Sequence, residues 1–141
     1  MVRNPGLTLP VLRTLRHRVP FQLQVPSVID NRSSLTSVDP VRTYKLNKDH
    51  KAVRISFWTG TNGDYWGVEE TDWNDAPILN GANKSVTIGG RHYQLYFVGG
   101  KLHMIALRSG GATYWVVNTL LDSLSNETMI AIAKGLRPVG R

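Results

Sequence analysis

Apolar and polar residues alternate along most of the chain after residue 41, as expected for strands that bury one face. Every second residue is apolar in the segment 53–57, and a period of two recurs in the segments 92–98, 101–108 and 113–119. Short turn sequences separate the strands: Asn62–Gly63, Gly89–Gly90, Gly99–Gly100 and Gly110–Gly111. Such pairs favour two-residue hairpin turns, whose central residues need positive φ. The pattern therefore predicts an antiparallel sheet built of hairpins.

The Gly-Gly turns also predict which side chains share a face. If each is a two-residue loop, Val98 lies opposite Lys101 and Ser109 lies opposite Ala112. One face is then almost wholly apolar and consists of Tyr93, Leu95, Phe97, Leu102, Met104, Ala106, Trp115 and Val117. The other face mixes aromatic, polar and aliphatic residues, namely His92, Gln94, Tyr96, His103, Ile105, Leu107, Tyr114, Val116 and Asn118.

The end of the chain has the pattern of an amphipathic helix. Ser125 is a suitable N-cap and Glu127 lies favourably in the first turn. An apolar stripe follows at helical spacing, formed by Met129, Ile132, Ala133 and Leu136, and the helix is expected to end at Arg137–Pro138. We expect this stripe to pack on the apolar sheet face, so that Trp115, Met104, Phe97 and Leu136 share one core. The predicted fold class is α+β, a twisted antiparallel sheet with a C-terminal helix packed on one face.

The first 40 residues have a different character. Five of the seven prolines lie there, which excludes a long helix or a central strand. We interpret residues 1–40 as a basic, proline-rich connector and residues 41–141 as the domain. Residues 8–18 have the spacing of a short basic amphipathic helix, which is expected to dock its leucines on the sheet; the alternative is a helix on a membrane surface. No apolar run approaches a membrane span or the core of a signal peptide.

Composition excludes a few classes of function but does not identify one. The 141 residues suit a single domain, and the absence of cysteine excludes disulfides, thiolate metal sites and cysteine nucleophiles. The net charge is +7, with basic residues predominating in 1–51 and 84–141 and acidic residues in 52–83. A basic chain is compatible with nucleic acid, an anionic membrane or an anionic polymer as partner, and also with a basic solvated surface. The sequence has no helix-turn-helix, RNP-like or zinc-knuckle motif, so we do not expect nucleic-acid binding.

Candidate catalytic and metal-binding groups are few. His92 and His103 are diagonal in the predicted register and lack the further ligands that zinc needs, so we expect neither a metal nor a cofactor. An acidic patch surrounds Trp73 and consists of Glu69, Glu70, Asp72 and Asp75. Paired carboxylates could serve sugar hydrolysis or bind calcium. Because Glu69 and Glu70 are neighbours in a strand and point to opposite faces, an ordinary solvated turn is the favoured interpretation.

The mixed sheet face is the candidate ligand-binding site. We expect Tyr96, His103, Tyr114 and Asn118 to lie together there, where aromatic rings stack on sugars while imidazole and amide groups bind hydroxyls. The favoured interpretation, because aromatic strand residues pack more often than they bind ligands, is that the N-terminal connector covers this face as a second layer through Leu12, Leu15 and Phe21.

Three segments resemble a known family. ATYWVVNTLLDSLSNETMIAIAKGLRP (Ala112–Pro138), YWGVEETDWNDAP (Tyr65–Pro77) and IGGRHYQLYFVGGKLHM (Ile88–Met104) are similar to the C-terminal extension of actinobacterial LytR-CpsA-Psr (LCP) proteins. Residues 4–46 resemble the segment that links the catalytic LCP domain to that extension.

The resemblance implies an accessory role in the cell envelope. LCP proteins face outward from the membrane and transfer glycopolymers from a lipid pyrophosphate carrier to peptidoglycan. No motif of their catalytic domain matches this chain, so no catalytic residue is carried over and no enzyme activity is expected. The implied function is a non-catalytic, extracytoplasmic domain that contacts cell-wall glycopolymer or the LCP catalytic domain. A basic nucleic-acid-binding protein and a small hydrolase that uses the acidic patch are the alternatives.

Overall fold

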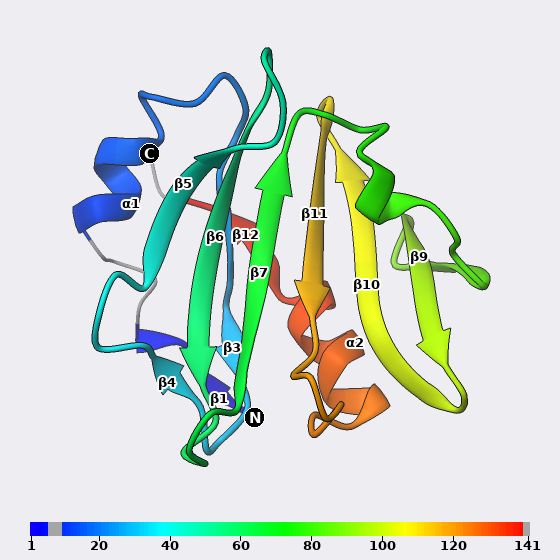
Figure 1. Cartoon of the computed structure of the whole chain (residues 1–141). Helices are drawn as coiled ribbons and strands as arrows, with labels where there is room; N and C mark the ends of the chain where they lie inside the picture. Colours follow the sequence, from blue (N-terminus) through cyan, green and yellow to red (C-terminus); the bar gives the residue numbers. More distant parts are fainter. Residues whose placement is uncertain (6–9, 140–141) are drawn as a thin grey trace.

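The centre of the fold is one antiparallel sheet (Figure 1). A computed structural model describes residues 1–5 and 10–139. The strand order is β4-β6-β7-β11-β10-β9-β8, and β5 also pairs with β6. The strands are β4 (Ser34–Leu35), β5 (Val41–Lys45), β6 (Lys51–Trp58), β7 (Tyr65–Thr71), β8 (Lys84–Ile88), β9 (Arg91–Val98), β10 (Lys101–Ser109) and β11 (Ala112–Val117). Together with a helix near each end of the chain, this sheet confirms the predicted α+β class.

Two hairpin meanders, β5-β6-β7 and β8-β9-β10-β11, make up most of this sheet. They join where β7 pairs with β11, so the segment between β7 and β8 must pass across β11, β10 and β9 to reach the far edge of the sheet; it contains a short 3-10 helix, η2 (Pro77–Leu79). The three Gly-Gly turns form as predicted. Asn62–Gly63 also forms the centre of a turn, but not the predicted two-residue hairpin loop, because the turn lies within a longer loop between β6 and β7. Within that loop, the Asp64 amide donates to the Thr61 carbonyl at 3.0 Å, and only Gly63 of the two central residues has a positive φ, 77°.

The helix α2 (Asn126–Lys134) packs behind the sheet. The hydroxyl of Ser125 accepts a hydrogen bond from the Thr128 amide at 3.1 Å, which confirms the predicted N-cap. The helix ends at Gly135, earlier than predicted. Leu136 is fully buried, but it belongs to the short strand β12 (Leu136–Pro138), which pairs with β2 (Gln24–Pro26).

The N-terminal segment is part of the same core. It forms β1 (Val2–Arg3), which pairs with β3 (Val28–Ile29), and the helix α1 (Pro10–Leu15), while residues 8 and 9 of the predicted helix lie outside the described residues. Its apolar side chains join α2 in one cluster behind the sheet: Leu12, Val19, Phe21, Leu23, Val25 and Ile29. The predicted boundary at residue 40 therefore does not separate two cores. None of the described helices is long and apolar enough to span a bilayer.

A β-bulge at His103 overturns the predicted faces of the sheet. Leu102 lies opposite Phe97, but Met104 lies opposite Tyr96, so His103 is an extra residue on β10. An extra residue reverses the alternation of side chains beyond it.

The bulge divides the predicted apolar set between two faces. We call the face covered by α2 and the N-terminal segment the inner face, and the opposite one the outer face. The inner face of β9, β10 and β11 carries Tyr93, Leu95, Leu102, Ile105, Leu107, Tyr114 and Val116. A separate outer cluster consists of Tyr96, Met104, Ala106 and Trp115. The expectation that Trp115 and Met104 share a core with Phe97 and Leu136 is wrong, because the latter two belong to the inner side.

Candidate functional site: a pocket on the outer face

The structure does not bring the four predicted ligand-binding residues together on one face. Tyr114 lies on the inner face with 1% of its surface exposed, and its hydroxyl donates to the Gln22 carbonyl. Asn118 is also buried, and its amide nitrogen donates to the carbonyls of Leu102 and Leu124 at 2.9 and 3.0 Å. Both side chains therefore stabilise the fold, and the alternative in which the N-terminal segment covers Tyr114 is the one observed.

The other two predicted residues lie elsewhere. Tyr96 is on the outer face, where its hydroxyl donates to the Leu79 carbonyl at 2.6 Å and burial raises the pKa of the phenol. His103, the bulge residue, is half-buried and its Nδ1 lies 2.8 Å from Asp122 Oδ1. The predicted placement is wrong because the bulge turns the remainder of β10 over.

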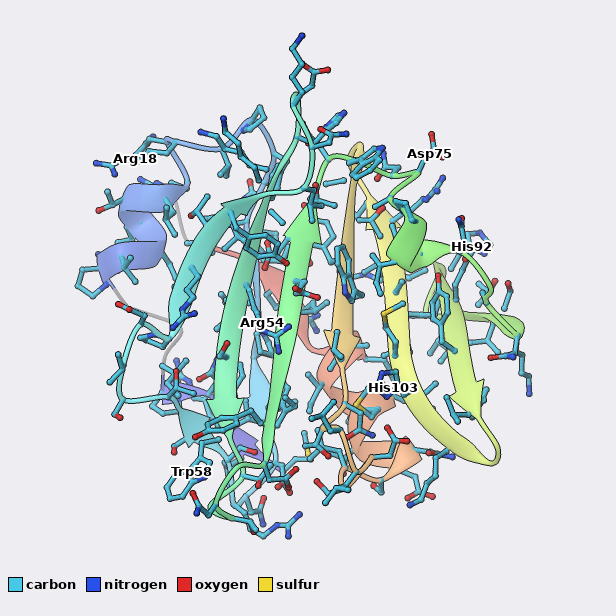
Figure 2. All side chains as sticks on the ribbon, in the orientation of Figure 1. Arg18, Arg54, Trp58, Asp75, His92 and His103 are labelled. Carbon is cyan, nitrogen blue, oxygen red and sulfur yellow. The ribbon has the colours of Figure 1, made fainter. Side chains whose placement is uncertain are left out.

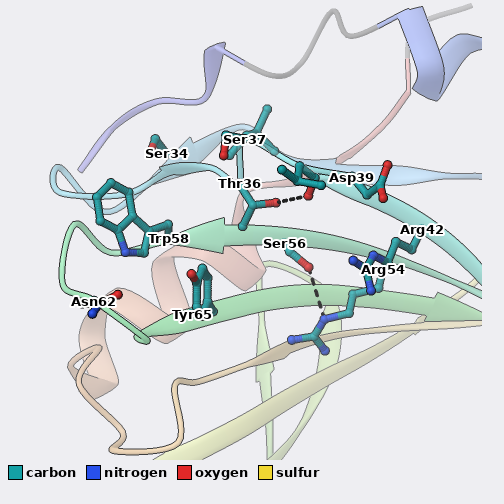
Figure 3. Close-up of a pocket in the computed structure, with 12 residues that line it drawn as sticks. Ser34, Thr36, Ser37, Asp39, Arg42, Arg54, Ser56, Trp58, Asn62 and Tyr65 are labelled. Atoms are coloured by element: carbon teal, nitrogen blue, oxygen red, sulfur yellow. Dashed lines mark hydrogen bonds between the residues drawn. The ribbon is translucent and has the colours of Figure 1, made fainter.

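A pocket lies further along the outer face, beside β6 and β7 (Figure 3). It has a volume of about 750 Å³. Its floor consists of side chains from β5, β6 and β7, and its rim is the segment 34–39. The lining includes two aromatic residues, two arginines and four serine or threonine residues, the latter being Ser34, Thr36, Ser37 and Ser56.

Aromatic rings occupy one end of the pocket (Figure 3). Trp58 and Tyr65 lie directly opposite each other across β6 and β7, and 39% and 48% of their surfaces are exposed. The Trp58 indole nitrogen donates to the Thr61 carbonyl at 2.8 Å, which fixes the ring. Two adjacent exposed rings provide flat apolar surface with polar edges, which suits the faces of sugar rings.

Arginines occupy the other end. Arg42 and Arg54 are directly opposite each other across β5 and β6. The Nε of Arg54 donates to Ser56 Oγ at 3.3 Å, and its Nη1 lies 3.3 Å from Glu69 Oε1. Figure 2 shows Arg54 in front of the sheet, on the face away from α2. Arg42 is exposed and forms no salt bridge with any described residue.

A glycine makes room for the Arg54 side chain. A Cβ at Gly67 would lie 3.1 Å from both Cζ and Nη2 of Arg54 and 3.0 Å from the Ile55 carbonyl oxygen. These distances are shorter than ordinary carbon contacts. The guanidinium group therefore lies against the backbone of β7, in a position that any other residue at 67 would obstruct.

Glu69 holds this arrangement from the side. Its Oε2 accepts from the Trp115 indole nitrogen at 2.9 Å, and its Oε1 accepts from the Tyr44 hydroxyl and contacts Arg54. Burial and the bond to Glu69 raise the pKa of Tyr44, so this phenol remains a neutral donor. The network orients Arg54 before any ligand arrives.

The acidic patch does not converge on one site. Glu69 and Glu70 face opposite sides of the sheet, as predicted; Glu69 belongs to the arginine network, and Glu70 is completely buried. Asp72 lies 2.9 Å from His50 Nδ1, and the His50 ring stacks on Trp73 with centroids 5.9 Å apart. Within residues 1–5 and 10–139, no three metal-ligating side chains are grouped to hold an ion.

The pocket was partly visible in the sequence. Alternation along residues 53–58 places Arg54, Ser56 and Trp58 on one face of a strand. The rim at residues 34–39 gave no such signal, because it is fixed by the pairing of β4 with the distant β6.

Comparisons with models of protein families, with curated proteins and with solved structures find no match to this chain.

Proposed function

We propose that this chain is a non-catalytic accessory domain of an LCP-type cell-envelope protein, and that it binds cell-wall glycopolymer in the outer-face pocket. The observation that carries the proposal is the exposed Trp58–Tyr65 pair at one end of a pocket lined with hydroxyl and guanidinium groups. Such a site offers ring faces for stacking and several hydrogen-bonding groups at fixed positions. That combination suits a carbohydrate.

The pocket favours binding over hydrolysis. Glycoside hydrolysis ordinarily needs two carboxyl groups on either side of the scissile bond. Asp39 is the only carboxylate among the described residues that line the pocket. Glu69 does not line the pocket, and its carboxylate already interacts with three donors, from Tyr44, Trp115 and Arg54.

The envelope location rests on the sequence resemblance, chiefly in residues 112–138. In the structure this segment forms β11, α2 and β12. Both α2 and β12 lie on the inner side of the sheet, while β11 is a strand of the sheet whose Trp115 lies on the outer face and donates to Glu69. The segment therefore supplies much of the core and one contact of the network around Arg54, and none of its residues lines the pocket. Contact with an LCP catalytic domain remains compatible with this arrangement, because the pocket opens to solvent.

Titration calorimetry of the full chain with purified wall glycopolymer fragments tests the proposal. Replacing Trp58 with Ala should weaken binding at least about tenfold, since it removes most of one stacking surface. Trp73→Ala is the matched control, because this tryptophan lies outside the pocket.

Two results would contradict the proposal. One is equal affinity of the wild-type and Trp58→Ala proteins for the fragments. The other is submicromolar binding to duplex or single-stranded nucleic acid at physiological salt, falling steeply as salt rises, which would support the nucleic-acid alternative.

A further inference from the structure

The arginine end of the pocket carries a charge that the fold does not neutralise. Arg42 and Arg54 occupy directly opposed positions on neighbouring strands, where like charges destabilise a sheet. Glu69 offsets Arg54. Arg42 has no corresponding salt bridge among the described residues, although it is aimed along the same pocket (Figure 3).

Arg54 also retains unused donors. A guanidinium has five N–H groups. The Nε bonds to Ser56 and Nη1 contacts Glu69, whereas Nη2 forms no hydrogen bond with a described residue. Arginine presents donors in a planar fork that matches the oxygens of phosphate and carboxylate groups. The group is therefore both fixed in position and able to receive an acidic ligand.

We infer that the pocket recognises an acidic glycan, with a phosphate or carboxylate between Arg42 and Arg54 and a sugar ring on Trp58 and Tyr65. This inference rests on the proposed function and specifies its ligand class. It follows from the arrangement of the aromatic end and the arginine end of the pocket, because a neutral sugar would contact the aromatic rings but leave the charges of the two arginines without a partner.

The spacing of the two ends sets the size of the ligand. Arg54 and Trp58 are four residues apart on β6, which corresponds to roughly 13 Å along an extended strand. One sugar ring does not bridge that distance, so ring and acidic group belong to successive units of a polymer or to a ring with a linker. Ser56 lies between them on β6, and Ser34 lies opposite Trp58 on β4, so both hydroxyls border the pocket.

Asp39 provides an internal control for charge. It lines the same pocket and is exposed. Its carboxylate lowers the local positive potential and repels an acidic ligand. Replacing Asp39 with Asn should therefore strengthen the binding of acidic ligands relative to that of neutral ligands.

The experiment compares matched sugars by NMR titration of the full chain. The neutral probe is N,N′-diacetylchitobiose, the acidic probes are its phosphorylated form and a disaccharide that contains glucuronic acid, and inorganic phosphate is titrated separately. We expect the acidic probes to bind at least tenfold more tightly at low salt, with the advantage shrinking as ionic strength rises. Arg42→Gln should remove that advantage, and because Arg42 is exposed and lies opposite the like-charged Arg54, the variant should not lower the thermal melting temperature. Asp39→Asn should increase the advantage severalfold.

The outcomes separate the inference from the proposed function. Equal affinity for neutral and acidic probes, with loss of both in Trp58→Ala, would overturn the inference and leave the glycan-binding function standing. Binding of inorganic phosphate as tight as that of the phosphorylated sugar would overturn it as well, because the ring would then contribute nothing. Absence of binding by every sugar would overturn both proposals. A preference between the phosphorylated and the uronic acid probe would support the inference and identify the acidic group.

Discussion

A buried carboxyl group makes the stability of this protein depend on pH. Glu70 is completely buried on the inner face of β7, where its Oε1 accepts a hydrogen bond from the Gln24 amide at 2.7 Å. Its Oε2 and the Oε1 of Gln24 are buried without partners. Burial raises the pKa of Glu70 well above its usual value of 4.5, and the bond from Gln24 only partly opposes this effect. The group is therefore protonated in the folded protein at a pH where the unfolded chain is ionised.

The sign of the effect follows from the protons bound in each state. Between the unfolded pKa of 4.5 and the raised folded pKa, the folded state holds one more proton than the unfolded state. The contribution of Glu70 to stability is thus complete below pH 4.5 and is lost as the pH rises from there through the folded pKa. The loss amounts to about 1.4 kcal/mol per pH unit.

The perturbation that tests this is Glu70→Gln. Glutamine keeps the shape and the acceptor for the Gln24 amide, but it does not titrate. Tyr114, which lies opposite Glu70 on β11, stays neutral over the same range because burial, and secondarily the charge of Glu70, raise its pKa to about 12. We expect the variant to gain stability over the wild type as pH rises above 5, by about 1.4 kcal/mol per pH unit until the pH passes the raised folded pKa of Glu70.

Urea unfolding at half-unit intervals from pH 5 to pH 9 measures the difference. The matched control is Glu127→Gln, which removes an exposed carboxylate from the first turn of α2, leaves Glu70 in place and should therefore retain the loss of stability that Glu70 causes as pH rises. A constant difference between Glu70→Gln and the wild type over the whole range would refute the reasoning. So would a difference that grows toward low pH.

Three further substitutions test the site and the core. Gly67→Ala should displace Arg54 and weaken the binding of acidic sugars while costing about 1–3 kcal/mol of stability; calorimetry that finds unchanged affinity would contradict the role assigned to this glycine. Leu136→Ala should destabilise the fold by about 2–5 kcal/mol because the side chain is fully buried, and an unchanged thermal melt would show that it is not. Asn118→Ala should lower the free energy of unfolding by roughly 3 kcal/mol, since the side chain forms hydrogen bonds with two carbonyls and two amides. If urea unfolding shows a decrease below about 1 kcal/mol, which is what a single hydrogen bond contributes, this network does not stabilise the fold as described.

Local patterns predicted the elements of the fold well. The Gly-Gly turns, the strands that they join and the Ser125 cap depend on residues close together in the chain, so alternation and turn chemistry were sufficient. The fold class followed from them.

The predicted placement of the candidate site residues is wrong because of a single residue. Alternation assumes that every residue of a strand is paired, and the bulge at His103 breaks that assumption without any glycine or proline to mark it. The bulge is held by contacts from outside the hairpin, through the Asp122 carboxylate and the Asn118 amide. Such long-range contacts leave no pattern in the local sequence. For the same reason, the sequence did not predict the rim of the pocket or the raised pKa of Glu70, since both depend on segments that are distant in the chain.

The pairing of β2 with β12 sets an order of events during folding. The C-terminal strand β12 pairs with the N-terminal strand β2, and Glu70 in the middle of the chain accepts a hydrogen bond from Gln24 of β2. An emerging chain can form the β5-β6-β7 meander early, but the N-terminal leucines and valines have no finished surface to cover until α2 and β12 have been made. Contacts between residues so distant in sequence slow folding, and until they form, the exposed apolar N-terminal segment can associate with wrong partners. We therefore expect refolding to proceed through a species with a formed sheet and an undocked N-terminal segment, in which Tyr114 is still accessible to solvent.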